Sequence, residues 1–212
     1  MRMTADEIYR TRKQFFNDHA EKWLDMWYKD PGTGRYDKHK MDFERLFSLL
    51  PLKPGDRVLD IGCGTGVLVP YILERITSTG LLYELDFAEK MIETNQSLHP
   101  QENIRFIISD AESAPLEEAS CDMVICFSCF PHLQDKEKAT RALSRILKPF
   151  GTFVVSHFNS SEEIREHHAS CHAVMHDHLP DEETMLALLK TAGLSVDMFM
   201  DEPGFYCIIA RK

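Results

Sequence analysis

From Asp56 onward, short apolar segments alternate with stretches whose apolar residues recur at helical spacing. Five of the apolar segments have the length of buried strands, namely RVLDI, LLYELD, IRFIIS, CDMVICF and TFVVSH. Helical stretches near Val67–Arg75, Ala88–Leu98 and Asp135–Leu147 separate them. Strands that alternate with helices form right-handed βαβ units, so this pattern predicts five parallel strands in one sheet.

The C-terminal part continues with two predicted helices and then two strands. The first helix is expected over Ser161–Met175, with Ser160 and Glu163 as a capping box, and the second over Asp181–Ala192, with Gly193 past its end. LSVDMFM and FYCIIAR, joined by DEPG, have the pattern of an antiparallel hairpin. The predicted fold class is therefore α/β, with a doubly wound, seven-stranded, mostly parallel, Rossmann-like sheet that ends in this hairpin.

The first 50 residues contain no strand-like segment. Aromatic and aliphatic residues recur near helical spacing in FFNDHAEKWLDMWY, and PGTG breaks the stretch. A second amphipathic helix over Met41–Leu50 follows, and Pro51 and Pro54 end it. We expect residues 1–50 to form N-terminal helices and residues 51–212 to form the α/β domain, within one compact unit.

Composition narrows the classes of partner. The length of 212 residues suits one domain, and a net charge of −10 without a run of Lys or Arg argues against nucleic acid as a partner. No apolar segment reaches the length of a membrane span, and MRMTADEIYRTRK lacks the apolar core of a signal peptide. The six cysteines lie in apolar segments, as free thiols in a reducing compartment would. We therefore expect a cytoplasmic protein without a membrane partner.

The motif GCGTG lies between the first predicted strand and the helix that follows it. Glycines at Gly62, Gly64 and Gly66 let the backbone pass close to a ligand at the carboxyl edge of the sheet, although a purely structural turn is the alternative. The dinucleotide fingerprint needs a glycine where Val67 stands, and a phosphate loop needs a Lys followed by Ser or Thr. Both phosphate-binding interpretations are therefore weakened.

Two aspartates follow the next two strands at the same edge of the sheet. Asp86 ends the second strand, where its carboxylate can accept hydrogen bonds from both hydroxyls of a ribose. Asp110 follows the third strand, where it can accept from the amine of adenine. A helix cap or a solvated turn is the alternative for either residue alone. The ordered series of a glycine loop and two acidic residues indicates a nucleoside ligand.

In this order, the motifs resemble those of the type 11 class I S-adenosylmethionine-dependent methyltransferases, which include the ubiquinone/menaquinone methyltransferases. VLDIGCGTG resembles their first motif, LDFAEKMI the ribose motif, SDAESAPL the adenine-side motif, CDMVICFSCFPHL the second motif and LSRILKPFGTFVVSH the segment after it. The resemblance covers about residues 40–158 and departs where Phe150 replaces a glycine. It implies a Rossmann-like class I methyltransferase fold that binds S-adenosyl-L-methionine.

The resemblance also implies which residues bind this cofactor. They are Asp60, Gly62, Cys63, Gly64, Gly66, Asp86, Phe87, Asp110, Ala111, Cys126 and Phe127. Asp60 and the glycine loop would face the methionine part, Asp86 the ribose, Asp110 and Ala111 the adenine, and Cys126 and Phe127 the other side of the sulfonium. The family's N-terminal segment folds over the cofactor as a lid, which makes Phe16, His19 and Trp23 candidates for lining the pocket. A helix that only packs on the sheet is the alternative.

Histidines are the candidates for acid–base chemistry. Methyl transfer from a sulfonium is an in-line displacement, so an enzyme accelerates it most by aligning the sulfur, the methyl carbon and the acceptor atom in a pocket without water. A general base helps when the acceptor must lose a proton. His157 ends the fifth predicted strand at the ligand-bearing edge and is the preferred general base. His132 in CFPHL is the second candidate, with local hydrogen bonding as its alternative role.

A divalent metal is a further hypothesis. On a continuous helix, His168, His172 and His176 would recur every four residues and share one face, which can present imidazoles to one metal ion. His157, His168 and His172 would be its ligands, because the strand end and the following helix converge over the cofactor. The alternative is a polar helix that covers the site with exposed or carboxylate-bonded histidines.

The sequence thus predicts an enzyme that transfers a methyl group to a small-molecule acceptor in a water-excluded pocket. One alternative is a non-catalytic module that binds S-adenosylmethionine or S-adenosylhomocysteine. Another is a nicotinamide-dependent oxidoreductase on a related sheet, which Val67 and the terminal hairpin disfavour.

Overall fold

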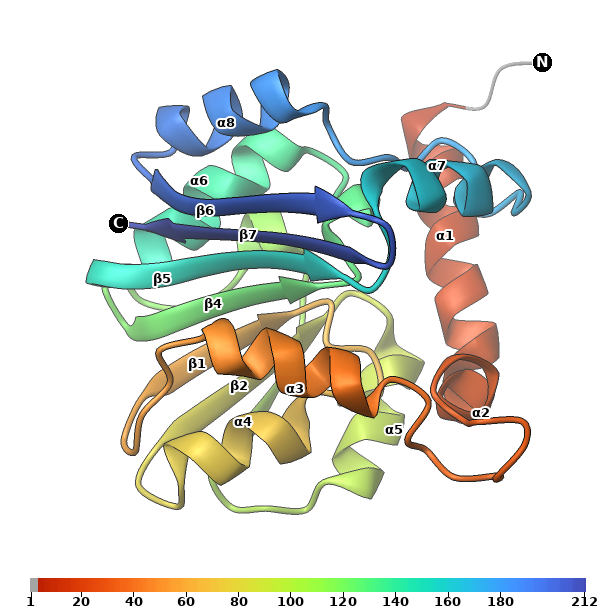
Figure 1. Cartoon of the computed structure of the whole chain (residues 1–212), viewed down its shortest axis with the longest axis horizontal. Helices are drawn as coiled ribbons and strands as arrows, with labels where there is room; N and C mark the ends of the chain where they lie inside the picture. Colours follow the sequence, from red (N-terminus) through yellow and green to blue (C-terminus); the bar gives the residue numbers. More distant parts are fainter. Residues whose placement is uncertain (1–3) are drawn as a thin grey trace.

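The computed structural model describes residues 4–212, and a seven-stranded sheet is its centre (Figure 1). The strands are β1 (Arg57–Ile61), β2 (Leu81–Asp86), β3 (Ile104–Ile108), β4 (Cys121–Phe127), β5 (Leu147–His157), β6 (Ser195–Glu202) and β7 (Phe205–Arg211). Their order is β3-β2-β1-β4-β5-β7-β6, and the pairings are parallel except those of β7 with β5 and with β6, which are antiparallel. The predicted α/β class, strand number and terminal hairpin are confirmed.

Helices cover both faces of the sheet. They are α1 (Ala5–His19), α2 (Trp23–Trp27), α3 (Lys40–Leu49), α4 (Val69–Ile76), α5 (Glu89–Leu98), α6 (Lys136–Ile146), α7 (Ser161–Ala169) and α8 (Glu182–Thr191), with short 3-10 turns at Ala20–Lys22, Ala111–Ser113 and Phe130–His132. On one face, residues of α3 and α4 share a buried cluster with Val58 of β1, and on the other, residues of α6 and α8 share a cluster with Leu59. Parallel strands buried on both faces are apolar at successive positions, as the sequence shows.

The N-terminal helices divide between two roles. Phe43, Leu46 and Phe47 of α3 are buried in the core beneath the sheet. By contrast, α1 and α2 lie across the carboxyl edge of the strands, beside α7 (Figure 1). A capping box between Thr4 and Glu7 begins α1, and this helix contacts α5. The segment that covers the edge is thus α1 to α2, and its movement as a lid stays a prediction.

The predicted helix over 161–175 is wrong in its second half. The capping box of Ser160 and Glu163 begins α7 as expected, but the helix ends at Ala169. Residues 170–180 then turn back, so that the Nδ1 atom of His168 lies 2.6 Å from the backbone oxygen of Asp177. A helix continued from Ala169 would carry Asp177 about 12 Å further along its axis and break this contact. The histidines of this region therefore do not share one helical face.

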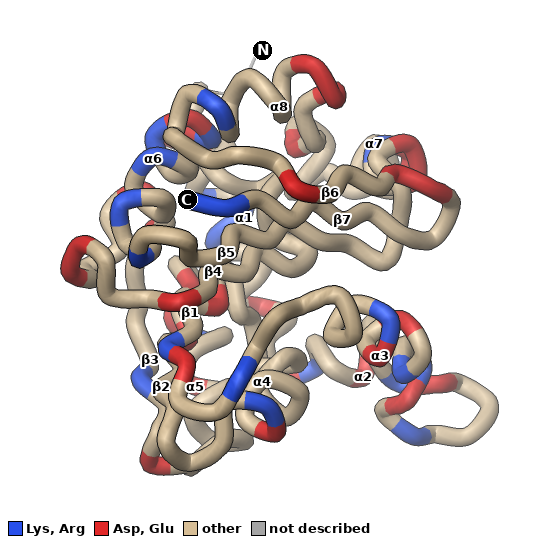
Figure 2. The backbone as a smooth tube through the Cα atoms, turned by 60° about the vertical axis from the view of Figure 1, so that its left-hand side comes forward, with Lys and Arg blue, Asp and Glu red and all other residues tan. Residues whose placement is uncertain are grey.

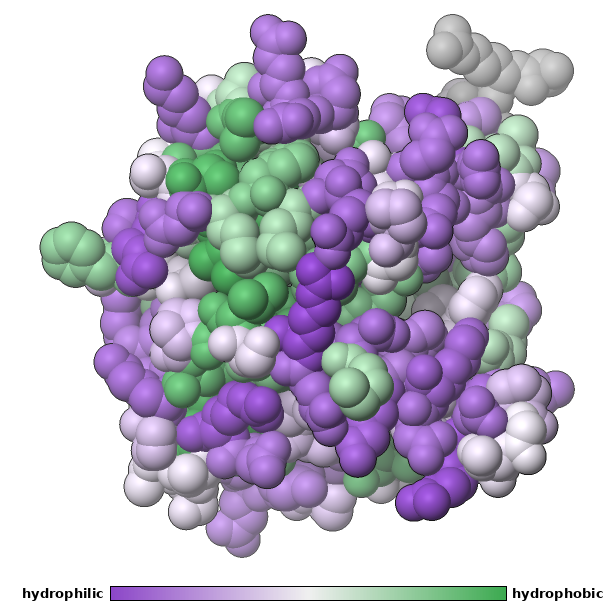
Figure 3. Space-filling model, in the orientation of Figure 1, coloured by the Kyte–Doolittle hydropathy of each residue, from purple (hydrophilic) through white to green (hydrophobic). Residues whose placement is uncertain are grey.

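The surface is mixed in charge, with one apolar area. Figure 2 shows Lys and Arg interspersed with Asp and Glu along the backbone, not gathered in one basic stretch. Figure 3 shows apolar side chains over β6 and β7 on the face in view, and Met198 and Met200 of β6 are only partly buried. Among residues 4–212, none of the helices combines the length and the apolar composition that a membrane crossing requires.

Replacing Phe150 with glycine is expected to stabilise the protein by about 0.5–1 kcal/mol. Phe150 has a φ of 65°, a left-handed conformation that favours glycine, and its side chain is 80% exposed, so little packing is lost. Urea unfolding measures the gain, and Phe150→Ala is the matched control because it keeps the Cβ atom that causes the strain. Equal stability of the glycine and alanine variants would contradict this prediction.

Candidate active site

A cavity lies at the carboxyl edge of the sheet, between the strand ends and the N-terminal helices. Many of the predicted residues line it, namely Phe16, Trp23, Asp60, Gly62, Cys63, Gly64, Asp86, Phe87, Asp110, Ala111, Phe127 and His132. Other predicted residues do not line it, namely His19, Gly66, Cys126, His157, His168 and His172. The cavity is where the sequence motifs converge, although the role of each residue stays a prediction.

Two glycines of the loop serve close packing. Gly62 has a φ of 61°, and a Cβ atom there would lie 2.4 Å from the Cβ of Cys129. Gly66 has a φ of 84°, and its Cβ would lie 2.3 Å from the Oδ1 of Asn95 in α5. Gly66 therefore brings the loop against α5 and does not contact the cavity. Side chains at either position would push the loop away from its neighbours.

Asp86 fixes the glycine loop as well as facing the cavity. Its Oδ1 accepts a hydrogen bond from the backbone N–H of Ala88 at 2.8 Å, and its Oδ2 accepts one from Gly64 at 3.0 Å. Burial raises the pKa of Asp86 to about 6, and these backbone donors oppose part of the rise. A carboxylate has further lone pairs, so the same group can still accept hydrogen bonds from a ribose.

Two buried oxygens at the cavity have no hydrogen-bond partner within residues 4–212. They are the Oδ2 of Asp60, at the end of β1, and the Oγ1 of Thr65 in the glycine loop. Burial, and next the nearby carboxyl of Glu84 on β2, raise the pKa of Asp60 well above its usual value. A buried polar group without a hydrogen-bond partner destabilises the protein, and a bound cationic ligand would supply such a partner. These two oxygens are therefore available to contact a bound ligand.

Aromatic side chains cover the cavity. The ring of Phe16 lies 5.5 Å from Trp23, 5.9 Å from Phe87 and 5.4 Å from His132. The hydroxyl of Tyr9 donates to the Oδ1 of Asp110 at 2.9 Å, which leaves Oδ2 available to another donor. Tyr9 lines the cavity but was missed in the sequence, because it precedes the aromatic stretch that marks the helical segment.

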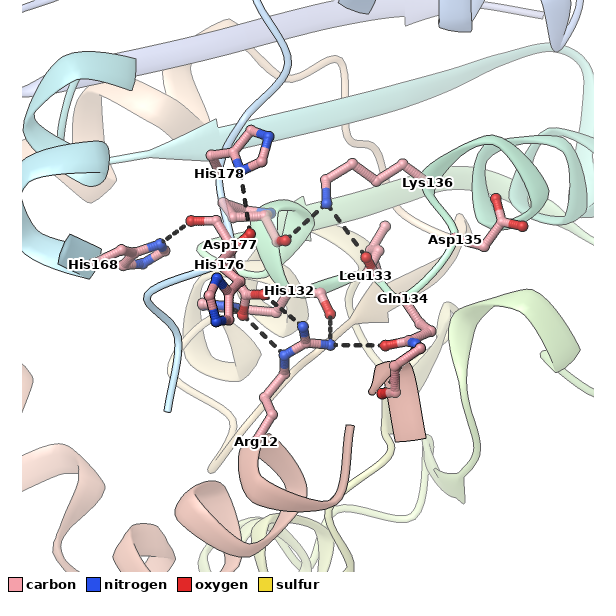
Figure 4. Close-up of polar contacts among 12 residues, drawn as sticks. Arg12, His132, Leu133, Gln134, Asp135, Lys136, His168, His176, Asp177 and His178 are labelled. Carbon is pink, nitrogen blue, oxygen red and sulfur yellow. Dashed lines mark hydrogen bonds and ion pairs between the residues drawn. The ribbon is translucent and has the colours of Figure 1, made fainter. Parts of the chain in front are cut away.

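His157 and His132 occupy different environments. His157 is buried at the end of β5 away from the cavity lining, and burial lowers its pKa to about 3. His132 lines the cavity, and its Nδ1 lies 2.8 Å from the Oδ2 of Asp177 (Figure 4). Of the two candidate bases, the structure brings only His132 to the cavity.

The metal hypothesis is not supported. His172 is exposed in the turn after α7, whereas His157 and His168 are buried. No group of three His, Cys, Asp or Glu side chains in the described part of the chain is arranged to hold a metal ion. The cause is the early end of α7, which removes the shared face on which the hypothesis depended.

The fold and this edge define the class of protein. A mostly parallel sheet places a glycine loop and two carboxylates around one cavity at its carboxyl ends, as nucleoside-binding Rossmann-like domains do. The antiparallel strand β7 distinguishes the sheet from purely parallel ones. The class is a Rossmann-like domain of the class I methyltransferase type.

Comparison with known proteins finds a similar domain family and similar methyltransferases. The family model described as a methyltransferase domain matches residues 59–155. The chain is 29% identical to the demethylmenaquinone methyltransferase of Staphylococcus aureus (strain MRSA252) over 120 residues, which cover 56% of this chain and 50% of that protein. It is 34% identical to the malonyl-[acyl-carrier protein] O-methyltransferase of Marinomonas sp. (strain MWYL1) over 135 residues, covering 60% of this chain and 48% of that protein. Residues 59–155 thus match the methyltransferase domain family, and the chain spans about half the length of these curated methyltransferases.

Solved structures share the fold over nearly the whole chain. A SAM dependent methyltransferase from Aquifex aeolicus matches with a TM-score of 0.70 and 22% identity, covering 92% of this chain and 96% of that one. The [4+2]-cyclase SpnF matches with a TM-score of 0.75 and 14% identity, covering 99% and 96%. At such identities the likeness shows the fold alone, so the reaction has to be argued from the site.

Proposed function

We propose that the protein transfers a methyl group from S-adenosylmethionine to a neutral small molecule. The observation that carries the proposal is the single cavity that joins Asp86, Asp110 and the unpartnered oxygen of Asp60 beneath an aromatic cover. S-adenosylmethionine supplies an electrophilic methyl carbon on a positively charged sulfur. The protein's part is to hold donor and acceptor in line and to keep water out.

Each part of the cofactor has matching groups in the cavity. Asp86 accepts from the ribose hydroxyls, and Asp110 accepts from the adenine amine through the oxygen that Tyr9 leaves available. Asp60 and the glycine loop bind the methionine part, and Phe127 packs beside the sulfonium. Phe16 and Trp23 close the cavity from α1 and α2, so the reacting atoms are shielded from water.

The charge of the lining selects the acceptor. Arg12 is the only Lys or Arg side chain among the described residues that line the cavity, and Asp177 already neutralises it. An anionic acceptor would therefore find no unpaired cation near the sulfonium site. A neutral aromatic molecule fits the tyrosine, tryptophan and phenylalanine side chains there. Of the substrates in the relatives' names, a quinone-like molecule suits this cavity better than a malonyl carboxylate.

Calorimetric titration with S-adenosylmethionine, S-adenosylhomocysteine and NADH tests the cofactor. The first two should bind, and preferential binding of NADH would overturn the proposal in favour of an oxidoreductase. Tritium transfer from methyl-labelled cofactor to naphthalene-1,4-diol, with malonyl-coenzyme A as the anionic comparison, tests the acceptor. Binding without transfer to either probe or to a wider panel of neutral aromatics would indicate a non-catalytic module.

The affinity for S-adenosylmethionine is expected to rise as the pH increases through about 6 and to level off above it. Burial raises the pKa of Asp86 to about 6, and ribose hydroxyl donors, with the cofactor's positive charge, favour its ionised form. Binding therefore releases protons below this pH. Calorimetry in buffers with different ionisation enthalpies measures the release. Affinity that is independent of pH between about 5 and 8 would contradict this assignment of Asp86.

A further inference from the structure

A buried ion pair joins α1 to the loop after α7, directly beside the cavity (Figure 4). The guanidinium of Arg12 donates through Nε to the Oδ2 of Asp177 at 2.8 Å and through a second nitrogen to Oδ1. Its third nitrogen donates to the backbone oxygen of His132 at 2.7 Å. Arg12 and Asp177 are 4% and 5% exposed. All three guanidinium nitrogens thus donate within the protein, so Arg12 connects α1 to this loop and is not itself a binding site for a substrate.

Asp177 also contacts the imidazole of His132. The Nδ1 of His132 lies 2.8 Å from the Oδ2 of Asp177, and an ionised carboxylate only accepts hydrogen bonds. The proton of neutral His132 must then be on Nδ1, which leaves a lone pair on Nε2. Within residues 4–212, Nε2 has no hydrogen-bond partner, and His132 lines the cavity beside Phe16. The cavity lining thus includes an imidazole whose Nε2 atom can accept a proton.

The charges around His132 keep it neutral without removing its basicity. Burial lowers the pKa of His132, while the carboxylate of Asp177 opposes this and the cations Arg12 and Lys136 add to it. Burial by itself raises the pKa of Asp177, but the hydrogen bond from His132, together with the charge of Arg12, holds it below its usual value. The carboxylate therefore stays ionised and can stabilise an imidazolium when one forms.

We propose that His132 is the general base of the methyl transfer, that Asp177 positions it, and that the acceptor is a molecule whose nucleophilic atom carries a proton. This inference rests on the proposed function. A lone pair of the acceptor atom forms the bond to the methyl carbon while the carbon–sulfur bond breaks and its electron pair stays on sulfur. The acceptor's proton moves to the Nε2 of His132, and water removes it after the product leaves.

The arrangement also couples the base to α1. Asp177 lies in a turn that Arg12 holds, so undocking of α1 removes the two hydrogen bonds that orient the carboxylate. His132 would then lose its oriented partner while the cavity is open to water. Closure of α1 thus assembles the base and shields the reacting atoms in the same movement.

Histidine nitrogen NMR of the full-length protein tests the proposal. Long-range ¹H–¹⁵N spectra at neutral pH should show His132 as the neutral tautomer with its proton on Nδ1, and Asp177→Asn should shift the population toward the Nε2–H tautomer, because an amide can donate to Nδ1. His132→Gln assigns the signals. His178→Gln is the matched control, since His178 is exposed and its Nδ1 bonds only to the backbone oxygen of His176. A protonated Nε2 in the unaltered protein would overturn the proposal.

A comparison of two bound ligands tests whether His132 faces the reacting atoms. Sinefungin places a cationic amine where S-adenosylhomocysteine has a neutral thioether, so it should lower the pKa of His132 by about half a unit to one unit relative to the homocysteine complex. The ring signals of His178 should be the same in the two complexes. Equal values for His132 in the two complexes would overturn its placement. If neither ligand binds, the proposed function fails, whereas the tautomer measurement on the unliganded protein still decides the state of the base.

Discussion

Replacing Asp86 with alanine is expected to weaken S-adenosylmethionine binding by about a hundredfold or more. The change would remove the two charge-assisted hydrogen bonds that we propose between Asp86 and the ribose, each worth about 1.5–3 kcal/mol. Every 1.4 kcal/mol corresponds to about a tenfold change in affinity. It also frees the backbone N–H of Gly64, which Asp86 holds at 3.0 Å, so the glycine loop loses a support. Calorimetry with S-adenosylmethionine measures the loss.

The control must separate lost ligand contacts from a disturbed fold. Glu93→Gln is suitable, because Glu93 is an exposed acid on the helix that follows Asp86 and pairs only with Lys90. This variant should bind as the unaltered protein does, since an exposed pair contributes about 0–1 kcal/mol. Thermal unfolding should show that Asp86→Ala remains folded at the temperature of the titration. Unchanged affinity in a folded Asp86→Ala protein would remove Asp86 from the ribose site.

The sequence predicted those parts of the site that depend on the succession of neighbouring elements along the chain. A strand, a glycine turn and a helix follow one another in the chain, so the position of Gly62 at the carboxyl edge follows from the βαβ pattern alone. Asp86 and Asp110 follow from the same rule, since parallel strands end at the same edge of a sheet. These residues line the cavity as expected.

The pair of Arg12 and Asp177 could not be predicted in this way. The two residues are 165 positions apart, and each is surrounded in the sequence by charged or polar residues typical of a surface. No periodic pattern marks a charged side chain as buried, because its burial depends on the partner that neutralises it. The same contact explains the wrong helix. Residues 170–180 are mostly weak helix formers, so a continuous helix is only weakly favoured there, and the turn that brings Asp177 to Arg12 replaces it.

The choice between His157 and His132 as the base shows that a position at the end of a strand does not by itself predict contact with the cavity. His157 does end β5 at the expected edge, yet the return strand β7 pairs with it through Tyr206 and buries it. His132 lies in a short 3-10 turn after β4, where no strand covers it. The sequence located both residues at the carboxyl edge, but only the packing of β7 decides which of them meets the cavity.

Replacing Arg12 with alanine is expected to destabilise the protein by about 3–5 kcal/mol, because the buried carboxylate of Asp177 would lose its main partner. This is a large part of the roughly 5–15 kcal/mol that stabilises a typical domain. His132 remains beside Asp177, and its protonated form can partly replace the lost cation. Loss of Arg12 favours protonation of His132 in the folded variant, so the pKa of His132 rises there. The protonated imidazole compensates for the lost guanidinium at low pH. This compensation is lost as the pH increases through that pKa. The deficit measured by urea unfolding should therefore be smaller at about pH 6 than at about pH 8.

Two further variants separate this effect from lost packing. Lys13→Ala, one residue along α1, removes a partly exposed pair with Glu89 and should cost no more than about 1 kcal/mol. Arg12→Met combined with Asp177→Leu removes both charges and should recover most of the stability, since an apolar pair of similar volume avoids burying an unpaired charge. The double variant should nevertheless lose the Nδ1–H tautomer preference of His132, because no carboxylate remains to set it. If Arg12→Ala costs no more than Lys13→Ala, the ion pair does not hold α1 against the loop. Docking of α1 would then not contribute to the orientation of His132 by Asp177.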